Sequence, residues 1–372
     1  MKRIISSLAV GIIILLSFMP LAGQFLGAGP NIDNRQLNSV PKWEGSLGNW
    51  FSNFDDYLND NFGFRSEWVR INRGVRDALK EDPPKVTKGK DGWLFLSNPD
   101  YRKEFEGRGD WTDERVENWI NALGALKQVA DDRQIPFAAM IAVDKSQMFP
   151  EKLPNNWVGP SSRRFRNALY EHPKAKEIGL IDPEPVLRKA KEEGIQIYQT
   201  RDTHWNRNGG YLATEMIWDR IDPNGERDRF RFDGNYKDAP STMLRDLERM
   251  AGYSETAEPT VLMVPFPNLP GYKSEKLPPL TEEAMARRFG QPAIKITSTA
   301  PAPKGTLLIV GDSFTNIPTR YLKTGYEDVI RIHRRNGEIP LSEIKLYDAD
   351  AIVFINSERH AGWLDAPFQV KP

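Results

Sequence analysis

The chain of 372 residues contains no cysteine, and this absence excludes disulfide bonds, cysteine ligands to metals and thiol nucleophiles. It also has no net charge, because 51 Lys and Arg residues balance 51 Asp and Glu residues. Whole-chain charge therefore gives no reason to expect a nucleic-acid partner. There are only four histidines, and the three besides His204 show no ligand-like spacing. We accordingly expect neither a metal nor a cofactor.

The N-terminus has the pattern of an export signal. Lys2 and Arg3 precede a stretch without charge that continues to Ile32, and the first acid is Asp33. An apolar segment of about 20 residues can span a bilayer, and basic residues before it favour an exported body. We predict that residues 1–30 are a signal anchor or a cleaved signal peptide. The body would then lie on the periplasmic or cell-surface side of the cytoplasmic membrane, anchored by this helix or released from it.

Residues 31–105 are predicted to form an N-terminal region that packs on the main domain. Trp50, Phe54, Tyr57 and Leu58 recur at helical spacing, which predicts an amphipathic helix. We interpret its aromatic side chains as core packing rather than as a binding surface.

Residues 106–372 show the alternation of strands and helices that is typical of an α/β domain. The predicted strands are 137–143, 179–182, 195–199, 306–310, 329–333 and 351–356, and the predicted helices are 111–131, 161–170, 183–193, 207–221 and 341–347. This order predicts a mostly parallel sheet with helices on both faces, with an insertion at about 222–300 that breaks the rhythm. Active sites on such sheets lie at the carboxyl ends of the strands.

Ser313 stands where a nucleophile is expected. The apolar run TLLIV ends at Val310, and Gly311, Asp312 and Ser313 follow it directly. A serine at a strand–turn–helix junction is exposed for attack, and its backbone N–H points to where an oxyanion would form. Gly311 permits the tight turn. The alternative is a serine that only caps the following helix.

The segment DTHWN supplies a base for this serine. Asp202 and His204 follow the predicted strand 195–199 and precede the predicted helix 207–221. A carboxylate beside an imidazole fixes its tautomer and stabilises the imidazolium that forms when it takes a proton. Other interpretations are a solvated turn, a helix cap by Asp202 or half of a metal site. Because a serine needs a base and the base needs an orienting group, we predict an Asp202–His204–Ser313 triad.

Two further side chains are candidates for substrate binding. Lys145 stands just after the predicted strand 137–143 and would hold the oxygen of an acyl intermediate or a sugar hydroxyl. The alternative is an ordinary surface ion pair between Asp144 and Lys145. Trp205 would stack on a sugar ring if it were exposed, and would otherwise belong to the core.

Several motifs together resemble a known family. KGKDGWLF, DTHWN and GDSF occur in this order, together with NRQLNSVPKW, FGFRSEW and PEKLP. This set resembles the alginate O-acetyltransferase AlgJ/AlgX group and its DHHW-type relatives. The resemblance implies an SGNH-hydrolase-like three-layer α/β fold with a triad at the matched positions Asp202, His204 and Ser313.

In hydrolases of the SGNH type the serine strand comes first and the Asp–His element comes last. Here the order is reversed, which would fit a circularly permuted version. By this topology, the oxyanion donors would be Asn356 at the end of the strand 351–356 and Gly337 in the loop after the strand 329–333. The alternative for Asn356 is a turn residue at the end of a strand.

The resemblance implies an exported O-acetyltransferase that moves acetyl groups onto polysaccharide hydroxyls through an acetyl-serine. Its acetyl donor would be delivered by a membrane-bound O-acyltransferase. Two alternatives remain open, because fold and motif do not settle activity. The first is an exported carbohydrate O-acetyl esterase with the same triad, and the second is a non-catalytic accessory protein of exopolysaccharide assembly.

Overall fold

The computed structural model describes most of the chain from residue 85 onward. The described residues are 40–43, 47, 50, 51, 53, 54, 57, 85–268, 271–278, 293–299, 302–333, 339–361 and 368–369. The predictions for residues 1–30 and for Gly337 lie outside them. No helix in the described ranges combines the length and apolar character that a membrane span requires.

The chain forms two compact units. Met1–Thr87 and Thr242–Ala257 make up the smaller unit, and Lys88–Ser241 and Glu258–Pro372 make up the larger one. In the smaller unit, Trp50, Phe54 and Tyr57 are helical, as their spacing predicts, and the rings of Trp50 and Phe54 stack with centroids 5.0 Å apart. At the start of its helix α11 (Asp246–Met250), the Glu248 carboxylate accepts the Arg245 N–H at 2.9 Å.

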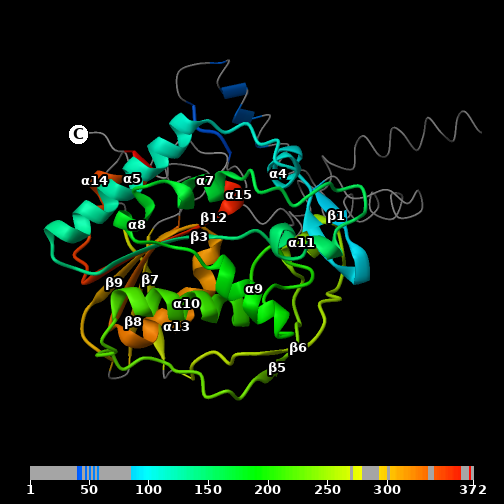
Figure 1. Cartoon of the computed structure of the whole chain (residues 1–372). Coiled ribbons are helices and arrows are strands. Elements are labelled where there is room, and N and C mark those ends of the chain that lie inside the picture. The colour runs from blue at the N-terminus through cyan, green and yellow to red at the C-terminus, as the bar shows by residue number, and fades with distance from the viewer. Residues whose placement is uncertain are drawn as a thin grey trace, which may run out of the picture. The chain divides into compact units, whose positions relative to one another are not determined.

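A seven-stranded sheet forms the centre of the larger unit (Figure 1). In spatial order its strands are β4 (Leu180–Ile181), β3 (Phe137–Ala142), β12 (Ala351–Ser357), β9 (Thr306–Gly311), β10 (Asp328–His333), β8 (Ile294–Ser298) and β7 (Tyr272–Lys276). The first five are parallel to one another, whereas β8 pairs antiparallel with both β10 and β7. The sheet is therefore mixed with a parallel centre, and the range 222–300 contributes its antiparallel edge.

Helices cover both faces of this sheet, so the larger unit has three layers. The helices are α4 (Pro99–Phe105), α5 (Asp113–Asp132), α6 (Lys145–Met148), α7 (Phe165–Glu171), α8 (Ala175–Ile178), α9 (Glu184–Glu192), α10 (Arg207–Ile221), α13 (Asn316–Leu322), α14 (Leu341–Ile344) and α15 (Glu358–Ala361). Strand β12 shows how the layers form: Val353 and Ile355 pack with α9, α10 and α13, and Ile352 and Phe354 pack with α5, α7 and α14. Every residue of β12 is buried, as a strand covered on both faces requires.

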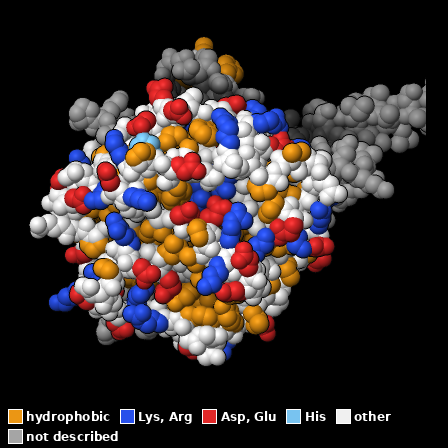
Figure 2. All heavy atoms as spheres, viewed as in Figure 1, with side chains coloured by type: hydrophobic (Ala, Val, Ile, Leu, Met, Phe, Trp, Pro, Cys, Tyr) orange, Lys and Arg blue, Asp and Glu red, His pale blue; other side chains and the backbone are white. Residues whose placement is uncertain are grey.

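The remaining elements are short. They comprise β1 (Val86–Lys88), β2 (Leu94–Leu96), β5 (Lys237–Ala239), β6 (Val261–Met263), β11 (Ile339–Pro340), β13 (Phe368–Gln369) and the 3₁₀ helices Lys90–Gly92, Pro150–Lys152, Ser313–Thr315 and Lys323–Gly325. On the face drawn in Figure 2, acidic and basic side chains are interspersed and neither sign forms a large area of its own.

One predicted strand is wrong. Residues 195–199 do not join the sheet, and Tyr198 makes only an isolated antiparallel bridge with Trp205. Ile197 and Tyr198 are nevertheless fully buried, and the Tyr198 hydroxyl donates to the Val143 carbonyl. The apolar run therefore belongs to a buried loop, whose pattern cannot be told from that of a short strand.

Candidate active site

Ser313 lies directly beyond the carboxyl end of β9, as predicted. β9 ends at Gly311, Asp312 caps the 3₁₀ turn Ser313–Thr315, and α13 follows. A Cβ atom at Gly311 would lie 1.8 Å from the Ile355 carbonyl oxygen of β12, so only glycine lets the two strand ends approach this closely. Ser313 is partly exposed at this junction.

His204 lies between Asp202 and Ser313. Its Nε2 is 2.7 Å from Ser313 Oγ, and its Nδ1 is 2.6 Å from Asp202 Oδ1. The backbone N–H of His204 also donates to Asp202 Oδ1 at 3.1 Å. With the proton on Nδ1, the imidazole donates to Asp202 and accepts the Ser313 hydroxyl, which is the arrangement required for general-base activation of a serine.

The loop that carries Asp202 is held from two sides. The Lys145 ammonium donates to the carbonyls of Gln199 at 3.1 Å, Thr200 at 3.0 Å and Asp202 at 2.8 Å. The Glu258 carboxylate accepts the N–H groups of Thr200 at 2.7 Å and of the following residue at 2.6 Å. Buried polar backbone groups are thereby paired although this loop has no ladder of its own.

Two predictions about substrate binding need correction. Lys145 is only 2% exposed, and because its three hydrogen bonds to the loop use all of its donors, it is neither a substrate ligand nor half of a surface ion pair. Trp205 is 1% exposed and its ring packs edge-on against Phe314 with centroids 5.0 Å apart, so it belongs to the core and cannot stack on a sugar.

A second polar cluster surrounds Asp312, the residue before Ser313. Its Oδ2 accepts from the Ser357 N–H at 2.8 Å and the Ser357 hydroxyl at 2.6 Å, and lies 2.8 Å from His360 Nδ1. Oδ1 accepts from the Phe314 N–H at 2.9 Å. Burial opposes ionisation, but the hydrogen bond and charge of His360 and the hydrogen bond of Ser357 hold the pKa of Asp312 well below its usual range. Asp312 therefore stays a carboxylate although it is buried.

The predicted oxyanion donors are not placed together by the described structure. Asn356 is fully buried near the end of β12, and its amide donates to the Ser357 carbonyl at 2.9 Å. The oxyanion roles of Asn356 and Gly337 remain predictions.

A polar pocket of about 250 Å³ lies beside α15. Its lining includes Tyr101 and Glu104 of α4, Arg115 of α5, and Glu358 and Arg359 of α15. Burial raises the pKa of Glu104 to about 7, even though its carboxylate accepts the Phe165 N–H. Arg359 connects this pocket to the site, since its Nη2 donates to Thr203 Oγ1 at 3.2 Å.

Sequence reasoning did not single out Glu258, Arg359 or His360. Glu258 lies within the predicted insertion at about 222–300, and the other two belong to α15, which follows β12 directly. The only available signal was that His360 is one of four histidines and stands just beyond a strand predicted to end at the site.

The sequence matches the profile of a family described as the SGNH hydrolase-like domain of acetyltransferase AlgX over residues 86–337. It is 25% identical over 215 residues to a probable alginate O-acetylase AlgJ of Pseudomonas fluorescens, covering 55% of this chain and 50% of the relative. A probable alginate O-acetylase AlgJ of Pseudomonas aeruginosa is 24% identical over 141 residues, which cover 37% of this chain and 33% of the relative. The chain thus spans about half or less of the length of these curated relatives.

Among solved structures, Bacillus cereus PatB1 superposes with a TM-score of 0.50 at 15% identity, over 73% of this chain and 95% of PatB1. At this identity the likeness concerns the fold alone. It agrees with the three-layer α/β architecture of the larger unit.

Proposed function

The chain belongs to the family of SGNH hydrolase-like acetyltransferase domains typified by AlgX, and on this premise we propose that it is an O-acetyltransferase that works through an acetyl-serine at Ser313. The resemblance inferred from the sequence motifs is thereby confirmed at the level of the family. One observation supports the catalytic proposal most directly: His204 lies within hydrogen-bond distance of both Asp202 and Ser313.

The first half-reaction forms the acetyl-serine. His204 Nε2 takes the Ser313 proton as Oγ attacks the carbonyl carbon of the donor's acetyl ester, and the resulting tetrahedral intermediate collapses when the donor oxygen leaves with that proton. Asp202 stabilises the imidazolium that forms between these two proton transfers. General-base help of this kind contributes about 10²- to 10⁴-fold in rate.

The second half-reaction transfers the acetyl group. His204 takes the proton of an acceptor hydroxyl, whose oxygen attacks the acetyl carbonyl, and Ser313 regains its proton as the ester bond to it breaks. The Ser313 N–H is the proposed oxyanion donor, with Asn356 as a second, and one such donor contributes roughly 10²- to 10³-fold.

The acceptor proposed for this reaction is a polysaccharide hydroxyl, because the curated relatives carry the name alginate O-acetylase. We further propose that the protein acts outside the cytoplasm and receives acetyl groups from a membrane-bound O-acyltransferase. The basic residues before the uncharged N-terminal stretch support export.

The test uses purified protein, a chromogenic acetyl ester as donor and uronic-acid oligosaccharides as acceptors, with mass spectrometry of the products. The proposal expects acetylated oligosaccharide that disappears in both Ser313→Ala and His204→Ala. Free acetate as the sole product, lost in the same variants, would identify an esterase instead. Undiminished turnover in Ser313→Ala would refute the acetyl-serine.

A further inference from the structure

The short helix α15 contacts both halves of the proposed catalytic chain. It follows β12 directly and consists of Glu358–Ala361. His360 reaches the turn that carries Ser313, and Arg359 reaches the loop that carries His204. Adjacent side chains of one helix thus connect two segments that are more than a hundred residues apart, since 109 positions separate His204 from Ser313.

The contact of His360 fixes the two neighbours of the nucleophile. His360 Nδ1 lies 2.8 Å from Asp312 Oδ2, and the same carboxylate accepts the Phe314 N–H at 2.9 Å through Oδ1. Asp312 is 1% exposed and also accepts two hydrogen bonds from Ser357. The backbone on both sides of Ser313 is therefore tied, through Asp312, to the end of β12 and to α15.

The contact of Arg359 fixes the surroundings of the base. Its Nη2 donates to Thr203 Oγ1 at 3.2 Å, and this hydroxyl lies 3.3 Å from His204 Nδ1. The Arg359 guanidinium carbon lies 5.1 Å from the ring centroid of Phe314, whose ring is 5.1 Å from that of His204. One guanidinium therefore contacts Thr203, the residue before His204, and Phe314, the residue after Ser313.

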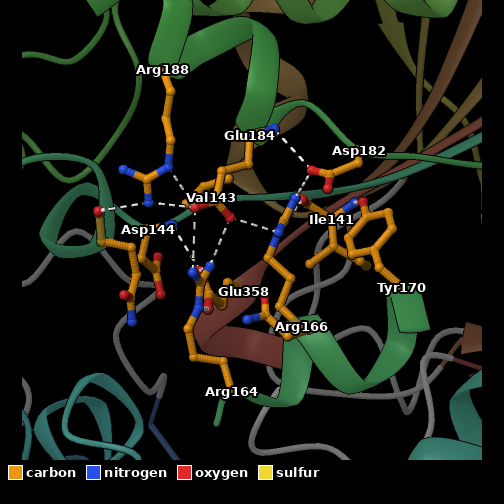
Figure 3. A network of polar contacts seen from close by, with 12 residues as sticks. Ile141, Val143, Asp144, Arg164, Arg166, Tyr170, Asp182, Glu184, Arg188 and Glu358 are labelled. Carbon is orange, nitrogen blue, oxygen red and sulfur yellow. Dashed lines mark hydrogen bonds and ion pairs between the residues drawn. The ribbon is translucent and has the colours of Figure 1, made fainter. Parts of the chain in front are cut away.

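The helix that carries these side chains is itself anchored by buried charges (Figure 3). Glu358 is 1% exposed and accepts from Arg164 Nε at 2.7 Å, from Arg164 Nη2 at 3.1 Å and from the Asp144 N–H at 3.1 Å. Arg164 also pairs with Glu184 of α9 at 3.2 Å. Breaking a buried pair of this kind is strongly unfavourable. The Glu358 ion pair therefore fixes the position of α15, and with it the positions of Arg359 and His360.

We propose that Arg359 and His360 are positioning residues that hold Ser313 and His204 at reacting distance. This inference rests on the proposed roles of Ser313 and His204. In it, neither Arg359 nor His360 exchanges a proton with the substrate. A displacement of reacting groups by about 1 Å can cost about 10²-fold in rate, so loss of either contact lowers the reactivity of Ser313 and leaves the first binding of a ligand unchanged.

The first experiment measures sulfonylation of Ser313 by phenylmethylsulfonyl fluoride, which reads nucleophile reactivity without any acceptor. In His360→Leu the Asp312 partner is lost, and kinact should fall by about tenfold or more with KI nearly unchanged. Tm should fall as well, because the buried Asp312 carboxylate loses a partner. In His360→Asn the amide nitrogen restores a donor near the position of Nδ1, and kinact should recover. The matched control is His172→Leu, because His172 Nε2 likewise lies 2.8 Å from a carboxylate, that of Glu117.

The second experiment changes the other contact without removing a buried charge. Thr203→Val deletes the acceptor of Arg359 and should lower kinact, whereas Thr203→Ser keeps it and should label like the wild type. Adding Arg359→Lys to Thr203→Val should lower kinact little further if both act through one contact. Arg163→Lys is the control, because Arg163 also stacks on a ring, Trp111 at 4.6 Å, and donates to backbone carbonyls.

The outcomes separate this inference from the proposed function. A wild type in which Ser313 is not labelled contradicts the proposed nucleophile. A labelled wild type with unchanged kinact in both His360→Leu and Thr203→Val overturns the positioning roles. The positioning roles are also overturned if kinact stays low in His360→Asn and in Thr203→Ser and falls in proportion to Tm across the variants.

Discussion

Replacing Lys145 by methionine tests whether this side chain stabilises the loop that carries Asp202 and His204. The substitution keeps the length of the side chain but removes the donor that three loop carbonyls share, those of Gln199, Thr200 and Asp202. A buried acceptor left without a partner costs about 1–3 kcal/mol. The Thr200 carbonyl also accepts the Leu94 N–H at 3.1 Å, so at most two of the three carbonyls lose their partner. Two such acceptors would cost roughly 2–6 kcal/mol if neither relaxed, and the apolar methionine offsets part of this loss. We expect the free energy of unfolding to fall by about 3 kcal/mol.

At roughly 2–4 °C per kcal/mol for a unit of this size, the corresponding fall in Tm is about 6–12 °C. Hydrolysis of a chromogenic acetyl ester should also slow, because Asp202 loses a contact that fixes its backbone. Denaturant unfolding and ester kinetics measure the two effects. The control is Lys191→Met, because Lys191 donates to the Met148 carbonyl at 2.7 Å and lies 4.7 Å from the Phe149 ring centroid but does not touch the loop. Equal stability and activity in Lys145→Met and the wild type would refute the reasoning.

Three other substitutions give distinct expectations. Asp202→Asn should lower kcat for ester hydrolysis about 10²- to 10⁴-fold with little change in Tm, since it removes the charge that stabilises the His204 imidazolium; a wild-type kcat would contradict the triad. Gly311→Ala should lower the free energy of unfolding, measured with denaturant, by about 1–3 kcal/mol or more, because its Cβ would lie 1.8 Å from the Ile355 carbonyl oxygen. An unchanged unfolding midpoint would show that β9 and β12 separate easily. The pKa of Glu104 is raised from 4.5 to about 7, so the folded state binds its proton more tightly and loses stability as pH rises between these values. The free energy of unfolding of Glu104→Gln, relative to that of the wild type, should therefore rise by up to about 3 kcal/mol between pH 4.5 and 8. Parallel pH profiles of the two unfolding free energies would contradict the raised pKa.

Local patterns predicted the centre of the fold. The apolar runs at β3, β9 and β12 and the helical spacing of apolar residues in α5 were sufficient. A doubly covered strand is a continuous apolar run, and an amphipathic helix repeats apolar residues every three or four positions. Strand β7 escaped detection, since it reads YKSEK and lies at an exposed edge where no apolar alternation is needed. The helix predicted at 341–347 is shorter, ending as α14 at Ile344.

The proposed triad could be predicted for a different reason. Asp202 and His204 are two residues apart, and Ser313 follows an obvious strand, so each motif can be recognised from neighbouring residues. Only the contact between the two motifs depends on the tertiary fold. The roles of Lys145, Arg359 and His360 depend on which distant backbone or side chain each one reaches. Side-chain direction at the end of a strand or in a short helix is decided by tertiary packing, so composition and spacing carried no signal for it.

The most direct test of the central claim is to capture the acyl-enzyme. Purified protein would be mixed with an acetyl ester, quenched in acid within one turnover and analysed by intact-mass and peptide-mapping mass spectrometry. The account predicts one added acetyl group on the peptide that contains Ser313, absent in Ser313→Ala and discharged when an oligosaccharide acceptor is added before the quench. Turnover of the ester without any acetyl group on that peptide, or with equal rates in Ser313→Ala, would contradict it.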